Sequence, residues 1–362
     1  MSFLADLATR GRAQLVAATL AAAASFAHAQ SALPMTGNPL LDPSPLPFGY
    51  PAFDRIRVEH FRPALEQGMA EQLREIDAIA HNAEAVTFEN TIVALERAGR
   101  RLGTVQRIFG NLNAAHTNDA LRALDKEFAP KAAAHSDAIR LNPALFARIE
   151  GLHRNANQLR LDPESRYLLD RYYKDFVRAG AKLSEPEKAR LRVLNAEIAS
   201  LQTAFSQSVL AETNASRVVV TDLAELEGLS EAEIASAAAA ANAAGLQGKY
   251  VLTLLNTSGQ PALGSLVNRS LRQRLHVASL SRGSRGGETD TTTLVSRLAR
   301  LRAERAQLLG YATHADLQLE EQTAAKVETV NRLLAELAAP AVANARREAA
   351  DIQAIIDREK GG

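Results

Sequence analysis

The fold is decided by the stretch Ser184–Leu210, which reads SEPEKARLRVLNAEIASLQTAFSQSVL. Ser184 is a typical N-cap residue, Pro186 suits a first helical turn, and Glu187 completes a capping box with Ser184. Apolar side chains then recur every three or four residues, as on one face of a helix: Leu191, Leu194, Ile198, Leu201, Phe205 and Val209. Polar residues such as Asn195, Glu197 and Gln202 are expected mostly off that face. A helix of this length spans about 40 Å, so it requires other helices against its apolar side.

The rest of the chain predicts a mostly α protein. Capped segments with helical periodicity recur from Val58 onward, and a last long helix is expected over Lys326–Lys360, kinked at Pro340. Strand signals occur at 217–221 and 250–255, which are short and rich in β-branched and aliphatic residues. We therefore expect a multi-helix lobe that carries a small two-strand element.

Composition excludes several classes of function. With 42 basic and 41 acidic residues the net charge is +1, which gives no global reason to expect a nucleic-acid partner. The chain has no cysteine, so disulfides and thiolate metal sites are impossible. Beyond the N-terminal region, no stretch reaches the length of about 18 uncharged apolar residues that a membrane span requires. We expect neither a nucleic-acid partner nor a membrane span.

The N-terminus has the pattern of a secretory signal peptide. Arg10 and Arg12 precede a short apolar run at 15–26, and Ala27-His28-Ala29 has the small residues of a cleavage site. We expect residues 1–29 to be removed after Ala29, which implies a periplasmic or secreted protein. The Pro-rich segment that follows, residues 30–57, is expected to form an extended arm, and residues 58–362 the helical body.

The chain offers no motif for catalysis. It contains eight histidines, but no His-Glu-x-x-His sequence, and therefore no zinc-protease helix. A Gly-x-Ser-x-Gly nucleophile elbow and a phosphate-binding loop are also absent. We assign no catalytic and no metal-binding residue.

One local charge bias could bind a ligand. The window from Arg269 to Arg305 is rich in arginine and poor in acidic residues, and it includes the loop Ser281–Gly287 before a helix. Arg282 and Arg285 in this loop could contact the carboxylate of a peptide. The alternative, which we favour, is a solvated helical face whose acidic partners come from elsewhere in the fold.

An ordered series of segments resembles the N-terminal half of the M3 family of zinc metallopeptidases. Within that family the chain is most similar to the peptidyl-dipeptidase branch, the bacterial dipeptidyl carboxypeptidases. The series extends from about Asn38 to the end of the chain: Asn38–Leu41, Phe53-Asp54, Glu59–Ala64, Phe88–Glu96, Ala114–Asp119, Ala179–Leu183, Leu254–Thr257, Gln260–Leu263 and Leu308–Tyr311. The segments are individually unspecific, but their order is informative.

The resemblance implies one wall of a helical channel that admits short peptides and has zinc at its floor. In the family, the zinc ligands and the residues that stabilise the transition state belong to the C-terminal half, so no catalytic residue can be transferred to this chain. The first hypothesis is therefore an N-terminal part of a peptidyl-dipeptidase, truncated or split from its catalytic lobe and inactive alone. The alternative is a non-catalytic helical module that binds peptides.

The last helix carries a large apolar face: Val327, Val330, Leu333, Leu334, Leu337, Ile352, Ile355 and Ile356. If no partner covers this face, it is exposed to water, and we expect self-association.

Overall fold

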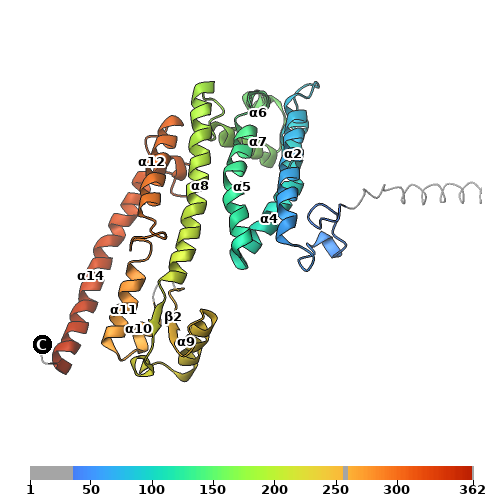
Figure 1. Cartoon of the computed structure of the whole chain (residues 1–362). Coiled ribbons are helices and arrows are strands. Elements are labelled where there is room, and N and C mark those ends of the chain that lie inside the picture. The colour runs from blue at the N-terminus through green and yellow to red at the C-terminus, as the bar shows by residue number, and fades with distance from the viewer. Residues whose placement is uncertain (1–35, 256–259, 361–362) are drawn as a thin grey trace, which may run out of the picture. The chain divides into compact units, whose positions relative to one another are not determined.

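The computed structural model describes residues 36–255 and 260–360, and most of these residues are helical (Figure 1). The expected signal peptide lies outside the described residues. The chain divides into two compact units, one comprising residues up to Gly68 together with Arg101–Gly110, the other comprising Met69–Arg100 and everything from Asn111 onward. Each unit is described by itself.

The first unit contains the Pro-rich segment and parts of two helices. The segment forms turns and a short 3-10 helix, η1 (Pro47–Gly49), and η2 (Val58–His60) leads into α2 (Phe61–Ala80). The rings of Phe61 and of Phe109, on α4 (Arg100–Ala115), meet edge to face at 5.3 Å. Asn38 Nδ2 donates to the carbonyl of His60 at 2.9 Å, which ties the segment to this core.

The second unit begins with short helices around a first apolar core. Its elements are η3 (Glu89–Val93), α3 (Ala94–Arg97), α5 (Asp119–Arg140), α6 (Pro143–Arg154), η4 (Ala156–Gln158) and α7 (Pro163–Arg178). Asn118, Asn142 and Asp162 cap α5, α6 and α7 through their side-chain oxygens. The core centres on Ile92, Leu145 and Leu169, all of which are fully buried.

Helix α8 (Glu185–Ala215) contains the stretch that the sequence singled out and extends five residues beyond it. Its capping box is present, because the backbone N–H of Ser184 donates to Glu187 Oε2 at 2.8 Å. Within the second unit α8 lies between α5 and α12 (Thr292–Leu308), as Figure 1 shows. Leu194 and Ile198 of α8 pack against Leu298 and Leu301 of α12. The predicted central helix is therefore confirmed, along with the mostly α fold.

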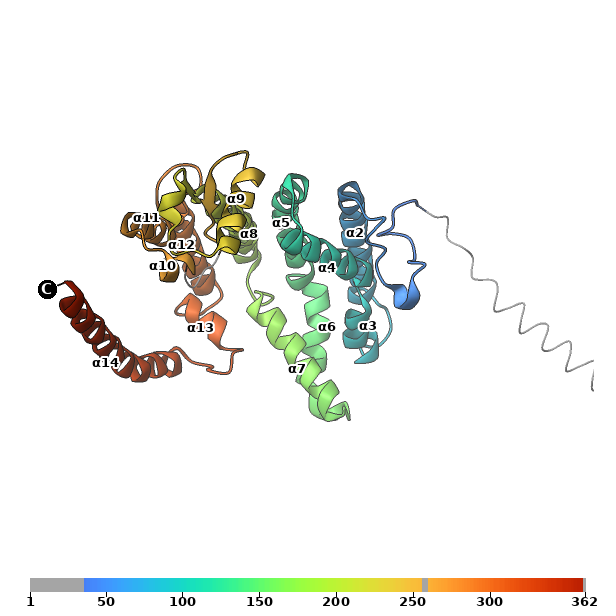
Figure 2. The same ribbon diagram turned by 90° about the horizontal axis from the view of Figure 1, so that it is seen from below.

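A two-stranded sheet follows α8. Strands β1 (Val218–Val220) and β2 (Tyr250–Leu252) pair antiparallel, with Val218 opposite Leu252. Both strands are shorter than the sequence suggested. Between and after them come η5 (Leu223–Leu226), α9 (Glu231–Ala243), α10 (Ala262–Ser265) and α11 (Arg269–Leu280), which share a core with the sheet (Figure 2).

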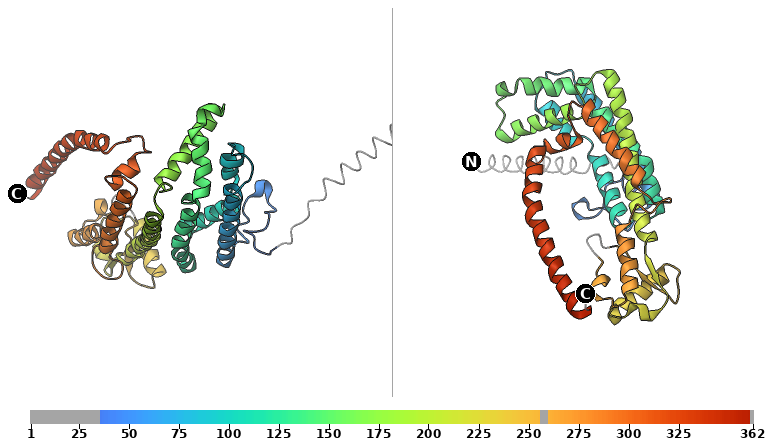
Figure 3. Two further views of the ribbon diagram at one scale, coloured as in Figure 1. Left: turned by 90° about the horizontal axis from the view of Figure 1, so that it is seen from above. Right: turned by 90° about the vertical axis from the view of Figure 1, so that its left-hand side faces the viewer.

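The chain continues through α13 (His314–Leu319) into α14 (Val327–Lys360), which Figure 3 follows to its C-terminal end. Pro340 lies inside α14, which continues as one helix on both sides of it. Every residue from Asn331 to Lys360 is exposed, including the apolar side chains of Leu334 and Ile352, each 58% exposed. Among the described residues, no helix combines the length and apolarity needed to cross a membrane.

Candidate functional site

Zinc is the metal that the family resemblance implies, but the described part of the chain does not provide a donor set for it. Nowhere in residues 36–255 and 260–360 do three or more His, Asp or Glu side chains gather at metal-binding distance. A zinc site of the metallopeptidase kind requires three protein ligands. The residues present therefore do not fit a catalytic zinc, and no reaction step is derived through one.

Arg285, one of the two arginines suggested as peptide contacts, forms an ion pair with Glu212 near the end of α8. Arg285 Nε donates to Glu212 Oε1 at 2.9 Å, and Ser216 Oγ donates to the same oxygen at 2.7 Å. Thr289 Oγ1 donates to the other oxygen. Burial alone would raise the pKa of Glu212, but the hydrogen bonds from Thr289, Ser216 and Arg285 outweigh it and lower the pKa to about 2.

Arg282 also forms hydrogen bonds within the protein. Its Nη1 donates to the carbonyl of Leu254 at 2.9 Å and its Nε to the carbonyl of Ser279 at 3.1 Å. Arg282 and Arg285 thus attach the 281–290 loop to its surroundings. The acidic partner of Arg285 comes from a distant part of the sequence, as the solvated-face alternative expected. A contact from either arginine to a peptide carboxylate stays a prediction.

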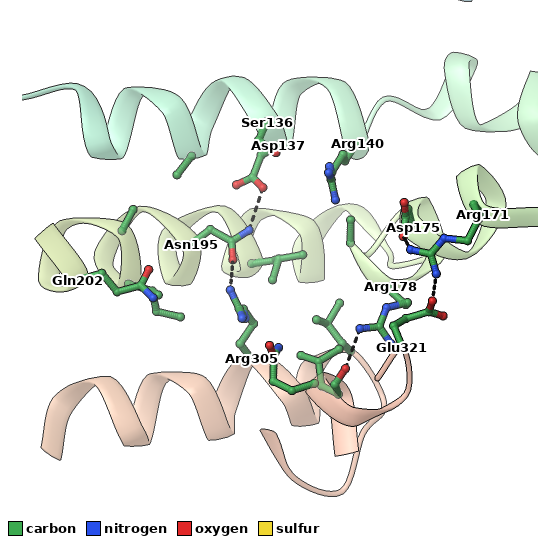
Figure 4. A pocket seen from close by; sticks show the side chains of 18 residues that line it. Ser136, Asp137, Arg140, Arg171, Asp175, Arg178, Asn195, Gln202, Arg305 and Glu321 are labelled. Carbon is green, nitrogen blue, oxygen red and sulfur yellow. Dashed lines mark hydrogen bonds and ion pairs between the residues drawn. The ribbon is translucent and has the colours of Figure 1, made fainter. Parts of the chain in front are cut away.

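A polar cavity of about 480 Å³ lies within the second unit, among α5, α7, α8, α12 and α13. Figure 4 shows its walls: Asp137 and Arg140 come from α5, Asn195 and Gln202 from α8, and Arg305 from α12. The lining contains four arginines and three carboxylates: Arg140, Arg171, Arg178, Arg305, Asp137, Asp175 and Glu321. No sequence motif pointed to this group.

Asn195 connects two charged groups of the cavity, Asp137 and Arg305. Its Nδ2 donates to Asp137 Oδ1 at 2.8 Å, and its Oδ1 accepts from Arg305 Nη1 at the long distance of 3.5 Å (Figure 4). Asp137 Oδ2 and Arg305 Nε are buried and have no hydrogen-bond partner in the described structure. Both charged groups are therefore incompletely satisfied.

Burial shifts the protonation of both groups toward their neutral forms. It raises the pKa of Asp137, against the opposing hydrogen bond from Asn195 and the charges of Arg192, Arg140 and Arg305. Burial also lowers the pKa of the Arg305 guanidinium, and the charge of Arg302 adds to that effect. The pair is thus held in an environment that stabilises neither charge well.

The other arginines of the cavity differ in their pairing. Arg171 pairs with Asp175 at 3.3 Å and with Glu321, as Figure 4 shows. Arg178 pairs with Glu320 and donates to the carbonyl of Leu317 at 2.7 Å. Arg140 is exposed and makes no hydrogen bond or ion pair with the described residues. Arg140 and Arg305 are therefore the two cations of the lining without a direct carboxylate partner.

Sequence reasoning missed this cavity, although one signal was present. Asn195 lies four residues after Leu191 and three before Ile198, so a polar amide occupies the apolar face of α8. We expected Asn195 and Gln202 mostly off that face, yet both line the cavity. Asp137 gave no such signal, because its burial depends on α8, which is distant in the sequence.

Comparison with known proteins shows what this chain is similar to. Residues 262–362 match the model of peptidase family M3. The chain is 41% identical over 327 residues to dipeptidyl carboxypeptidase of Escherichia coli, covering 90% of this chain and 48% of that protein. It is 42% identical over 328 residues to dipeptidyl carboxypeptidase of Salmonella typhimurium, covering 91% of this chain and 48% of the relative.

More distant matches are to peptidases of the same kind. Oligopeptidase A of Escherichia coli is 27% identical over 328 residues, covering 90% of this chain and 48% of the relative. The chain thus spans about half the length of the curated relatives it matches. The resemblance to peptidase family M3 is confirmed, and along nearly all its length the chain is most similar, among these relatives, to bacterial dipeptidyl carboxypeptidases.

Proposed function

We propose that this chain is the non-catalytic half of a zinc-dependent peptidyl-dipeptidase, an enzyme that releases dipeptides from the C-termini of short peptides. The observation that carries the proposal is the 41% identity to dipeptidyl carboxypeptidase, which extends over 90% of this chain but only 48% of that protein. The part of the relative that the alignment leaves out has room for a complete metal site. The chain's own part is to form one wall of the peptide channel.

The metal chemistry of such an enzyme resides outside the described residues. Zinc, when bound, activates a water molecule for attack on the peptide carbonyl. The described residues of this chain hold no cluster of zinc donors, so their contribution is to bind and orient the peptide and to support the catalytic lobe. We expect no chelator-sensitive hydrolysis by the chain alone.

Helix α14 supports the proposal of a missing lobe. From Asn331 onward its apolar side chains are exposed: Leu333 at 55%, Leu334 at 58%, Leu337 at 55%, Val342 at 49% and Ile352 at 58%. An apolar stripe of this extent on a helix is typical of a surface that another protein segment covers. The catalytic half of the peptidase is the occupant that the family relationship suggests.

The proposed location is the periplasm or the extracellular space. Its support is the signal-peptide pattern that ends at Ala29. Expression in a bacterium with the native N-terminus, followed by N-terminal sequencing of the periplasmic fraction, tests this. A mature N-terminus at Gln30 is expected, whereas an intact N-terminus on a cytoplasmic product would contradict it.

An activity assay with complementation tests the main proposal. The chain is purified and incubated with an N-terminally blocked tripeptide and zinc, alone and together with the remaining half of E. coli dipeptidyl carboxypeptidase, expressed separately. We expect chelator-sensitive dipeptide release only in the mixture. Activity of the chain alone would refute the assignment. If the mixture is inactive although sedimentation shows that the two halves associate, the complementing role is refuted.

A further inference from the structure

We propose that the cavity among α5, α7, α8, α12 and α13 is a binding site for a small organic polyanion, a di- or tricarboxylate, held between Arg140 and Arg305. This site would be separate from the peptide channel chemistry and would belong to the chain itself. All the residues that line it lie in the second unit.

The first argument is the balance of charge around Arg305. The charges of Arg140, Arg192 and Arg305 act on Asp137 and the charge of Arg302 acts on Arg305, whereas the carboxylates of Asp175 and Glu321 are paired with Arg171. Because burial favours the neutral form of Asp137, that carboxylate compensates even less of the positive charge. An anion that enters the cavity would meet a net attractive field.

The second argument is the state of Arg305 itself. Its side chain is half-buried, its Nε has no partner, and its hydrogen bond to Asn195 Oδ1 is stretched to 3.5 Å. A guanidinium removed from water is stabilised mainly by carboxylate or phosphate oxygens in good geometry. The protein provides no such oxygen to Arg305 within hydrogen-bond distance in the described structure. An exogenous anion would supply the oxygen that Arg305 lacks beyond its long hydrogen bond to Asn195.

Asp137 gives an independent sign of a ligand site. The residue is only 7% exposed, lines the cavity, and leaves Oδ2 without a partner. A carboxyl whose pKa is raised by burial carries a negative charge less readily, so it repels an incoming carboxylate less than an ordinary aspartate would.

The size of the cavity decides between a simple ion and a larger molecule. A volume of about 480 Å³ falls within the range of small-molecule sites and would leave most of the space empty around one inorganic ion. Arg140 extends from α5 and Arg305 from α12, on different walls of the cavity (Figure 4). A molecule with a carboxylate at each end offers an anionic group to both walls of the cavity.

Titration calorimetry of the whole chain with citrate tests the proposal, in metal-free buffer with ionic strength matched by sodium chloride. We expect saturable binding that weakens at least tenfold in R140Q and in R305Q, and stays unchanged in R346Q, which alters an exposed arginine on α14. Arg140 is itself exposed, so R140Q remains informative even if R305Q does not fold. Succinate should bind at the same site.

Three outcomes would overturn the proposal. The first is that citrate shows no more binding to the chain than sodium chloride does at the same ionic strength. The second is binding that R140Q leaves unchanged or that R346Q weakens equally. The third is inorganic phosphate binding as tightly as citrate, which would show that the ligand does not span two arginines. None of these results bears on the peptidase assignment, because complementation is measured with peptide substrate and without citrate or succinate.

Discussion

Replacing Glu212 by Gln should destabilise the chain strongly, because this carboxylate fixes the 281–290 loop to the end of α8. Glu212 is 4% exposed and accepts hydrogen bonds from Arg285, Ser216 and Thr289. Its pKa falls from 4.5 to about 2 on folding. Because one pKa unit corresponds to 1.36 kcal/mol, the ionised form of Glu212 contributes about 3 kcal/mol to the free energy of unfolding at neutral pH.

The sign of the pH dependence follows from the direction of the shift. Because the folded-state pKa is lower than the unfolded one, the stabilisation is complete above about pH 5 and is lost as the pH falls toward 2. By pH 3 the wild type should have lost about 2 kcal/mol of this contribution. E212Q has no such proton to bind, so this part of its pH dependence should vanish.

The assay is urea unfolding followed by circular dichroism, at pH 7 and at successive values down to pH 3. The matched control is E304Q. Glu304 also forms an ion pair with an arginine, Arg190, but at a half-exposed site: the Glu304 side chain is 44% exposed and the Arg190 side chain 47%. The control should cost about 1 kcal/mol or less. The reasoning is refuted if E212Q costs no more than E304Q at pH 7, or if it keeps the wild-type slope between pH 5 and pH 3.

Three further predictions follow from the core, the cavity and α14. L194A removes a fully buried side chain between α8 and α12 and should cost about 3–5 kcal/mol, measured by urea unfolding; a loss below about 1 kcal/mol would show that the packing is loose. D137N should raise the melting temperature at pH 8 and change it less at pH 4, because a carboxyl with a raised folded-state pKa destabilises the folded state increasingly as the pH rises above its unfolded pKa; a lower melting temperature at pH 8 would contradict this. The chain should self-associate in light scattering, and L334E with I355E on the exposed face of α14 should restore monomers; a wild-type monomer at high concentration would be the opposite result.

Much of the helical framework could be predicted because it depends on local signals. The capping box at Ser184 and the apolar spacing from Leu191 onward predicted the start and the buried face of α8, and both are present. The two strands were also located correctly, because Val218–Val220 is a β-branched run bounded by polar residues. Their lengths were overestimated, because strand ends depend on pairing, which leaves only three residues on each strand.

The polar sites could not be predicted because their members are far apart in the sequence. Glu212 and Arg285 are separated by 73 positions, and Asp137 and Asn195 by 58. The arginine-rich window allowed either an anion-binding loop or pairing with acidic residues from elsewhere, but it could not identify the carboxylate on α8 that pairs with Arg285. The cavity around Arg305 required the packing of several helices before its charge balance became visible.

Zinc binding by the isolated chain tests the central claim most directly, namely that the metal site of the proposed enzyme lies outside these residues. The chain would be dialysed to equilibrium against zinc and the bound metal measured by mass spectrometry, with full-length E. coli dipeptidyl carboxypeptidase processed in parallel. We predict that the chain retains no more zinc than a metal-free control protein. Stoichiometric, chelator-sensitive zinc on the chain alone would contradict the account.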